Sequence, residues 1–258
     1  DSGTVTVAGN LVATTDDNNG VIDLGQMAVD GTVALTTNGN GAATIVNDAG
    51  LNFTTSTVTG ALSATATTGD ITDSGNLTIT GAATFITGVD ESNIVLDSSG
   101  NAFSSSVEMR ADAGGEDFGN ITFVDSAGID FATSAGSNGD LYINSSTDGT
   151  VGGNLSVTAT TGNITDTVAV VTTGSSTSSF TTSATNGTIT LNTPASLAGA
   201  VTLSTTGASG NATIDNGTTA LNIAASSIGG NLTVTSGAGA GITDSGTVTV
   251  AGNLVATT

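Results

Sequence analysis

The sequence predicts an all-β protein with the architecture of a parallel β-solenoid, and three observations support this prediction. The fifteen residues DSGTVTVAGNLVATT at 1–15 recur letter for letter at 244–258, a shift of 243 residues. Stretches of alternating apolar and polar residues follow a glycine about every 10–12 residues, as half-buried strands do. The apolar residues are almost all Val, Ile, Leu and Ala, which suits a narrow interior. Such repetition is typical of solenoids.

Residues 1–243 are one tandem-repeat period, and residues 244–258 are the start of the next. The motif GALSATATTGDITDSGNLTITG, which begins at Gly60, resembles the motifs that begin at Gly153 and Gly230, so the period contains three irregular sub-blocks. Because the sub-blocks share the same strands and turns, we predict one continuous solenoid through the whole period.

The spacing of the turn glycines predicts the size of one coil. In the C-terminal half, Gly187, Gly210, Gly230 and Gly252 follow one another at steps of 23, 20 and 22 residues. A coil of about 20–23 residues with two or three short strands gives roughly 11–12 coils per period. At about 4.8 Å per coil, one period would rise by about 55 Å.

The expected strands share one pattern, a glycine followed by five or six alternating residues. They begin after Gly9, Gly31, Gly60, Gly75, Gly119, Gly139, Gly153, Gly187, Gly199, Gly210, Gly230 and Gly246. The alternation places one set of apolar pairs in the core: Leu77/Ile79, Leu155/Val157, Ile189/Leu191, Val201/Leu203, Leu232/Val234 and Val248/Val250. The Thr residues between them then point to solvent, where Thr is a favourable strand residue.

Many of the acidic residues are predicted to belong to the corners between strands. An Asp stands one to three residues before a Gly at several turns, as at Asp48, Asp73, Asp97 and Asp215. An Asp side chain can accept hydrogen bonds from its own turn, and Gly can adopt a positive φ. We therefore expect these carboxylates to stabilise turns without any ligand.

The segment 85–144 departs from the regular pattern. It contains Phe85, Phe103, Phe118, Phe123, Phe131 and Tyr142, the three Glu residues Glu91, Glu108 and Glu116, and the one basic residue, Arg110. Its turns are more loosely spaced. We expect wider coils or a longer loop here, with the aromatic rings filling extra interior volume.

A string of immunoglobulin-like sandwiches about 80 residues long is the rival fold, since it would match the three sub-blocks. Such sandwiches usually have a Trp or Tyr in each core and prolines in the linkers. The chain has no Trp, one Tyr and one Pro. The solenoid is therefore the better prediction.

The charge of the chain excludes several classes of partner. There is one Arg, no Lys, no His and 22 acidic residues, for a net charge of −21. Nucleic acids and anionic membrane surfaces are bound through basic residues, so neither is an expected partner. No apolar run reaches the roughly 18 residues of a membrane-spanning helix, and we expect no membrane insertion.

The residue types also exclude several kinds of catalysis. Without His or Cys, neither a Ser-His or Cys-His nucleophile pair nor a zinc site can form. We predict that the chain is not an enzyme and needs no cofactor. Paired carboxylates leave a polysaccharide-cleaving β-helix enzyme as a weaker alternative, although a single Arg is a poor supply of basic groups.

Calcium is the one metal for which the sequence offers candidate ligands. Asp16 and Asp17 form one compact acidic group, and Asp112, Glu116 and Asp117 form another. Neither group matches an EF-hand loop, so solvated acidic loops are the preferred interpretation. Repeated Thr-x-Thr motifs suggest an ice-binding surface as a further alternative, but the motifs skip coils.

Two long motifs carry a resemblance to a known family. GNLSVTATTGNITDT at 153–167 and GNLTVTSGAGAGITDSGTVTVAG at 230–252 resemble the repeats of filamentous-haemagglutinin-like exoproteins, which are large bacterial surface adhesins. The resemblance implies a right-handed parallel β-helix that acts as a rigid extracellular stalk at the bacterial cell surface. Its expected partners are neighbouring repeats or stacked copies of itself. The alternative is an adhesive module at 85–144 that binds a surface glycan or calcium.

Overall fold

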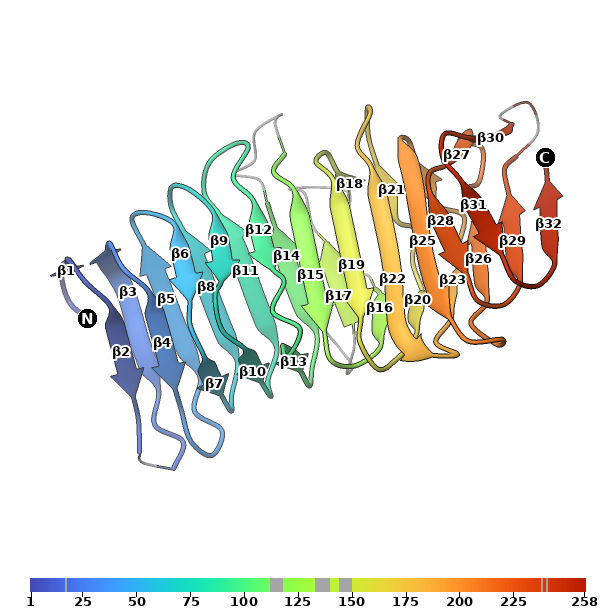
Figure 1. Ribbon diagram of the computed structural model, residues 1–258. Coiled ribbons are helices and arrows are strands. Elements are labelled where there is room, and N and C mark those ends of the chain that lie inside the picture. Colours follow the sequence, from blue (N-terminus) through green and yellow to red (C-terminus); the bar gives the residue numbers. More distant parts are fainter. Residues whose placement is uncertain (17, 112–117, 133–139, 144–149, 238, 240) are drawn as a thin grey trace.

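The protein is a parallel β-solenoid, as the computed structural model shows in Figure 1. The structure describes residues 1–16, 18–111, 118–132, 140–143, 150–237, 239 and 241–258. Strands stack side by side along one axis, and the two chain ends lie at opposite ends of the rod. The predicted solenoid is confirmed, with about ten turns, close to the 11–12 that the glycine spacing predicts.

The strands form three sheets. The first sheet contains, in spatial order, β1 (Val5–Val7), β3 (Ile22–Val29), β5 (Ala43–Asn47), β8 (Leu62–Ala66), β11 (Ala83–Thr87), β14 (Val107–Arg110), β17 (Asp140–Ile143), β16 (Ile129–Phe131), β20 (Ile164–Asp166), β23 (Ile189–Leu191), β26 (Ala212–Asp215), β29 (Leu232–Thr235) and β32 (Leu254–Thr257).

The second sheet is the largest. It contains, in spatial order, β13 (Ala102–Phe103), β10 (Leu77–Ile79), β7 (Ser56–Val58), β4 (Val33–Thr36), β6 (Leu51–Phe53), β9 (Ile71–Asp73), β12 (Ile94–Leu96), β15 (Ile121–Asp125), β19 (Leu155–Ala159), β22 (Ser178–Thr185), β25 (Ala200–Thr206), β27 (Leu221–Ile223) and β30 (Ile242–Asp244). Off this path, β2 (Leu11–Thr14) pairs with β4, and β28 (Ser226–Ile228) pairs with β25 and β31 (Val248–Val250). The third sheet contains β18 (Thr150–Val151), β21 (Val171–Thr172) and β24 (Ser196–Leu197).

Every strand pair among the described residues is parallel, and each pairs with the turn before or after it. Hydrogen bonds between equivalent corners join residues 20 to 25 positions apart along most of the rod. Immunoglobulin-like sandwiches consist of antiparallel strands, so the rival fold is excluded for the described strands. No helix in the described part of the chain is long and apolar enough to cross a membrane.

The middle of the rod has longer turns and an unexpected strand order. Hydrogen bonds between adjacent turns there join residues 34 and 35 positions apart. β17 lies between β14 and β16, although β16 comes first in the sequence. Longer turns use more residues for each step along the axis, which accounts for a turn count slightly below the predicted one.

The alternating pattern sets which side chains enter the core. All predicted inward pairs from Leu77/Ile79 to Leu232/Val234 are buried, and Val248 and Val250 pack against the core from the last turn. Thr78 and Thr80, on either side of Ile79, are exposed. Successive side chains of a strand point to opposite faces of the sheet. Once one side chain of a strand is known to face the core, the direction of the others follows.

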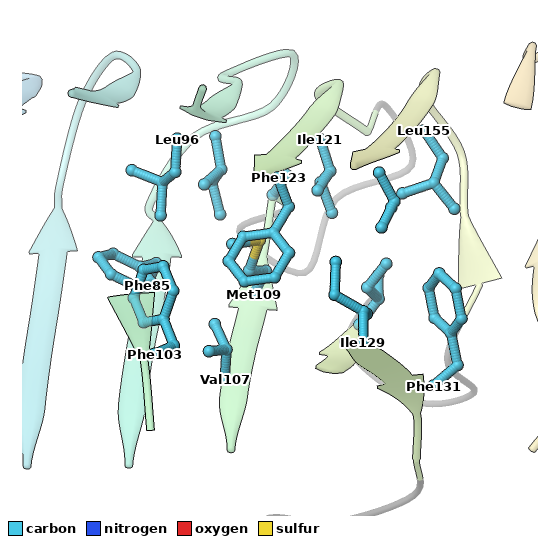
Figure 2. Close-up of a cluster of buried hydrophobic side chains, with 14 of the residues drawn as sticks. Phe85, Leu96, Phe103, Val107, Met109, Ile121, Phe123, Ile129, Phe131 and Leu155 are labelled. Atoms are coloured by element: carbon cyan, nitrogen blue, oxygen red, sulfur yellow. The ribbon is translucent and has the colours of Figure 1, made fainter. Parts of the chain in front are cut away.

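Phenylalanines from successive turns contact one another inside the rod. The ring centroids of Phe53 and Phe85 lie 6.4 Å apart, those of Phe85 and Phe103 6.1 Å, and those of Phe103 and Phe123 5.2 Å. Figure 2 shows three of these rings in the core beside Met109. The first two contacts are edge-to-face, which is a favourable geometry for aromatic pairs.

Several glycines that precede strands are required because the backbone of the adjacent turn lies very close to them. Gly153 and Gly31 do not have a positive φ. A Cβ on Gly153 would instead collide with the backbone of Gly119, one turn below. Among the glycines that follow a predicted corner Asp, Gly217 has the expected positive φ of 54°, whereas Gly50, Gly75 and Gly100 do not.

We expect Gly153→Ala to lower the free energy of unfolding by about 1–3 kcal/mol, the usual range for overpacking. Gly9→Ala is the matched control. Gly9 is also followed by an Asn and then a strand, but a Cβ at Gly9 would meet no atom within 4 Å. The control should be neutral or slightly stabilising. Urea unfolding followed by circular dichroism tests both, and equal midpoints would contradict the close-approach explanation.

Candidate functional site

The predicted calcium ligands do not form a described site. Asp17, Asp112, Glu116 and Asp117 lie outside the described residues. Asp16 is exposed on the first turn. Among the residues that the structure describes, no group of three or more acidic side chains is placed to hold a metal ion.

Corner carboxylates mostly bond to the next turn rather than to their own. Asp73 accepts hydrogen bonds from the backbone N–H of Asp97 at 2.9 Å and from the Asn101 side chain at 2.7 Å. Asp166 accepts from the N–H of Asn192 at 2.9 Å. The prediction that Asp caps its own turn is wrong at these corners. It is correct for Asp215, which accepts from Gly217 N–H at 2.9 Å.

Asparagines form a ladder along one outer corner. The side-chain oxygen of Asn93 accepts the Asn120 N–H, that of Asn120 accepts the Asn154 N–H, and that of Asn154 accepts the Thr177 N–H, each at 2.8 Å. The ladder is exposed to solvent. The Gly-Asn motif is therefore a device for joining turns: glycine permits the close approach, and asparagine binds the turn above.

A second set of asparagines is buried and was not predicted. Asn47, Asn101 and Asn216 are fully buried at corners. Asn216 accepts the Leu197 N–H at 2.7 Å and donates to the Leu197 carbonyl at 3.2 Å, so it holds the turn below by both backbone groups. Asn47 binds both backbone groups of Val29 in the same way. Only the alternation of neighbouring apolar residues could have suggested that these side chains face inward.

Two carboxyl groups titrate at higher pH than usual. Burial raises the pKa of Asp125, and the N–H groups of Phe103, Ala127 and Ser126 oppose part of this shift. Burial also raises the pKa of Asp166, and the nearby Asp130 charge adds to the increase. Both carboxyls belong to corners of the rod, and they have structural partners rather than an open cleft around them.

We expect the protein to become more stable as the pH falls from 7 towards 4. A folded-state pKa above the unfolded value means that the folded state holds the proton more tightly. The stabilisation is complete below the unfolded pKa of about 3.8 and is lost as the pH rises through the folded pKa. Loss of repulsion among the acidic residues acts in the same direction.

Thermal melting of Asp125→Asn at pH 7 and pH 4.5 tests this expectation. The amide keeps an acceptor for Phe103 N–H, so the variant should melt a few degrees higher at pH 7 and depend less on pH. Asp97→Asn removes the same charge from an exposed position and controls for net charge. Identical pH profiles for the two variants would show that Asp125 burial does not contribute.

The outer faces of the sheets are rich in hydroxyl groups. Thr165, Thr190, Thr213 and Thr233 occupy one register position in four consecutive turns. The next turn has Val255 at this position. This column of Thr side chains therefore ends at the last turn, and the ice-binding alternative stays a prediction.

The described aromatic rings of the 85–144 segment lie mainly inside the rod. Phe85, Phe103, Phe123 and Phe131 are at most 3% exposed. Arg110 pairs with Glu108 at 3.0 Å on the outer face of β14. Buried rings fill the wider turns and cannot stack on a sugar.

The most distinctive surfaces are the two open ends. Large exposed apolar side chains include Val5 and Val12 near one end and Leu254 and Val255 at the other. At the C-terminal end a cavity of about 400 Å³ opens between β29, β30, β31 and β32, and it is lined by Leu232, Ile242, Val248 and Leu254 among others. The described interior strands of the two large sheets have neighbouring strands on both sides.

The comparison with protein families agrees with this architecture. A family model described as repeats of unknown function (DUF5649) matches residues 40–110 and 209–258, slightly less than half of the chain. No curated protein and no solved structure matches the chain. The match and the stacked parallel strands together describe a repeat protein with a β-helix fold.

Proposed function

We propose that the chain is a structural segment of an extracellular fibre or giant surface adhesin, in which tandem periods form a rigid stalk. The observation that carries the proposal is the repetition of residues 1–15 at 244–258 on a parallel β-solenoid. Because each turn of a solenoid pairs with the turn before and after it, a repeated sequence can extend the same rod period after period.

The interior supports a mechanical role. Parallel ladders, stacked phenylalanines and asparagine corners tie each turn to the next at the backbone, the core and the outer edge. Such a rod resists bending because any bend must open several of these ladders together. The proposal assigns the chain no catalytic activity, cofactor or bound calcium.

The acidic surface also suits an exposed stalk. A net charge of −21 keeps neighbouring rods apart and discourages non-specific adhesion along the shaft. Binding would then belong to another part of the same fibre. A location at the bacterial cell surface follows from the resemblance to filamentous-haemagglutinin-like repeats and is part of the proposal.

Two measurements test the proposal. Electron microscopy of chains with one, two and three tandem periods should show straight rods that lengthen by about 45–50 Å per period, since about ten turns stack at about 4.8 Å each. Antibodies against residues 1–258 should label intact source cells as strongly as permeabilised ones. Flexible or globular particles would contradict the rod, and labelling only after permeabilisation would contradict the extracellular location.

A further inference from the structure

The strands of the repeated sequence lie in different sheets in its two copies. In residues 1–15, β1 belongs to the first sheet and β2 to the second. In residues 244–258, the identical strands β31 and β32 belong to the second and the first sheet, respectively. Each of these two sheets continues from turn to turn along the rod, so a sheet marks a side of the rod. One period later, the same sequence therefore lies on a different side.

The sheet of each copy is determined by its pairing with interior turns. Leu11 of β2 pairs with Val33 of β4, and β4 continues the second sheet through β6 and β7. The identical Leu254 of β32 pairs with Leu232 of β29, and β29 continues the first sheet through β26. Both assignments rest on strands inside the rod, and neither requires a free chain end.

A related motif changes sides in the middle of the period. The motifs that begin at Gly60, Gly153 and Gly230 each start with a strand. That strand is β8 after Gly60 and β29 after Gly230, both in the first sheet, but it is β19 in the second sheet after Gly153. The Ile-Thr-Asp strand that follows is β9 or β30 in the second sheet, but β20 in the first sheet for the middle motif. The motif therefore folds on either side.

The middle motif makes the same contacts as the motif at Gly60. Asp73 at the end of β9 accepts the backbone N–H of Asp97 at 2.9 Å, and Asp166 at the end of β20 accepts that of Asn192 at 2.9 Å. Ile71 and Ile164, which begin the two strands, are both fully buried. A change of side therefore costs the motif neither its corner hydrogen bond nor its place in the core.

The order of strands shows how far the repeated sequence moves. A strand of the second sheet is followed by one of the first, as from β4 to β5 and from β28 to β29. The sequence LVAT has thus moved forward by one strand position, from β2 to β32. The preceding VTV moves with it, because β1 pairs with the end of β3, beyond a register shift and just before the second sheet. A regular turn has three such positions, as in β22, β23 and β24.

We propose that each 243-residue period rotates the repeated surface by one strand position, about one third of a turn around the rod axis. Equivalent surfaces then face the same way only in every third period. Turn lengths from 20 to 35 residues explain the rotation, because a period built from unequal turns need not contain a whole number of them.

The pairings of the two copies fit together in one continuous chain. In a tandem array, the unit at residues 244–258 would keep its contact from Leu254 to Leu232 below. The pairing of Leu11 with Val33 shows that Val33 of the next period would stack on Leu254 from above. The next period then begins in the first sheet where the previous one began in the second, and the rotation repeats at every junction.

The rotation rests on the proposed stalk and adds how the stalk presents its surface. A partner on one side of the fibre, such as a second rod of the same sequence, would meet equivalent surfaces only every three periods, about 135–150 Å apart. The corner carboxylates of successive periods also lie on different sides, so the negative charge surrounds the shaft. The fibre then has no single contact side.

Gold labels on a three-period chain test the rotation. Thr57 is exposed and points outward between two buried residues of β7, and the chain has no native Cys. Thr57→Cys in every period, labelled with gold clusters through the thiol, gives one label per period. Electron tomography should show the three labels on three different sides of the rod, about one third of a turn apart.

A pair of labels within one period is the matched control. Thr57→Cys/Ser227→Cys places both thiols at exposed outward positions of the second sheet, on β7 and β28. These two labels should lie on the same side, and any small angle between them measures the twist of the sheet itself. Thr57 labels that form one line along the three-period rod, after correction for this twist, would overturn the rotation. Straight rods that lengthen with each period would still support the stalk, so the two proposals can fail separately.

Disulfides across the junction of a two-period chain give a second test. With the rotation, Val12 of the second period lies beside Thr233 of the first, as the identical Val255 does here. Without it, Val12 would stay in the second sheet, where the strand below is β28 with Ser227. We expect about tenfold more disulfide from Thr233→Cys with Val12→Cys of the second period than from Ser227→Cys with the same partner. An equal or greater yield from the Ser227 pair would contradict the rotation.

Discussion

Phe85→Ala is expected to lower the free energy of unfolding by about 3–5 kcal/mol, the largest effect of any single substitution considered for this chain. Phe85 is fully buried and lies between Phe53 and Phe103, with centroid distances of 6.4 and 6.1 Å. Removal of the ring leaves a cavity and breaks two edge-to-face contacts. The packed turns above and below cannot collapse into that space without breaking their own ladders.

Urea unfolding followed by circular dichroism measures this effect. Thr84→Ala is the matched control, because Thr84 precedes Phe85 on the same strand and faces outward. Its substitution should change stability by no more than about 0.5 kcal/mol. Repeat rods can unfold in parts, so hydrogen exchange should also show faster opening of the turns that contain Phe53 and Phe103. Similar midpoints for both variants would contradict a continuous aromatic core.

Asn216→Ala should lower the free energy of unfolding by about 2–4 kcal/mol, because each buried backbone group left unpaired costs about 1–3 kcal/mol. The side chain accepts the Leu197 N–H at 2.7 Å and donates to the Leu197, Thr219 and Ala220 carbonyls. All of these bonds disappear in the variant. Water cannot replace them at a position with no solvent exposure.

Asn154→Ala is the control for this prediction. Asn154 also binds the next turn, by accepting the Thr177 N–H at 2.8 Å, but it is exposed. Water can satisfy the freed N–H, so the loss should stay near or below about 1 kcal/mol. Thermal melting of the two variants side by side distinguishes a buried corner from an exposed one. An equal loss of stability in the two variants would show that burial does not determine how much a corner asparagine contributes to the free energy of unfolding.

The sequence alone was sufficient to predict the solenoid, the approximate turn length and the inward residues. Each of these depends on local geometry, since a strand turns every second side chain inward and a glycine corner follows each strand. Leu77 and Ile79 could therefore be assigned to the core from their immediate neighbours. Letter-for-letter identity was enough to identify residues 1–15 and 244–258 as one repeated unit.

The corner partners could not be predicted in this way. The Asp73 carboxylate accepts the backbone N–H of Asp97, and Gly153 lies against the backbone of Gly119. In each case the partner is a whole turn away in the sequence. Because turn length varies from 20 to 35 residues, no fixed offset predicts such partners. The predicted calcium ligands other than Asp16 lie outside the described residues, so that hypothesis stays a prediction.

The repeated segment shows most directly what the sequence determines and what the tertiary structure determines. Its sequence determines two short strands with a Gly-Asn corner, and both copies form them. Only the tertiary structure decides which face of these strands is covered. Leu11 packs against the core and Leu254 is 58% exposed, although their local sequences are identical. The physical reason is that burial in a solenoid comes from the adjacent turns, and Leu11 pairs with Val33 of the following turn whereas Leu254 pairs with Leu232 of the preceding one.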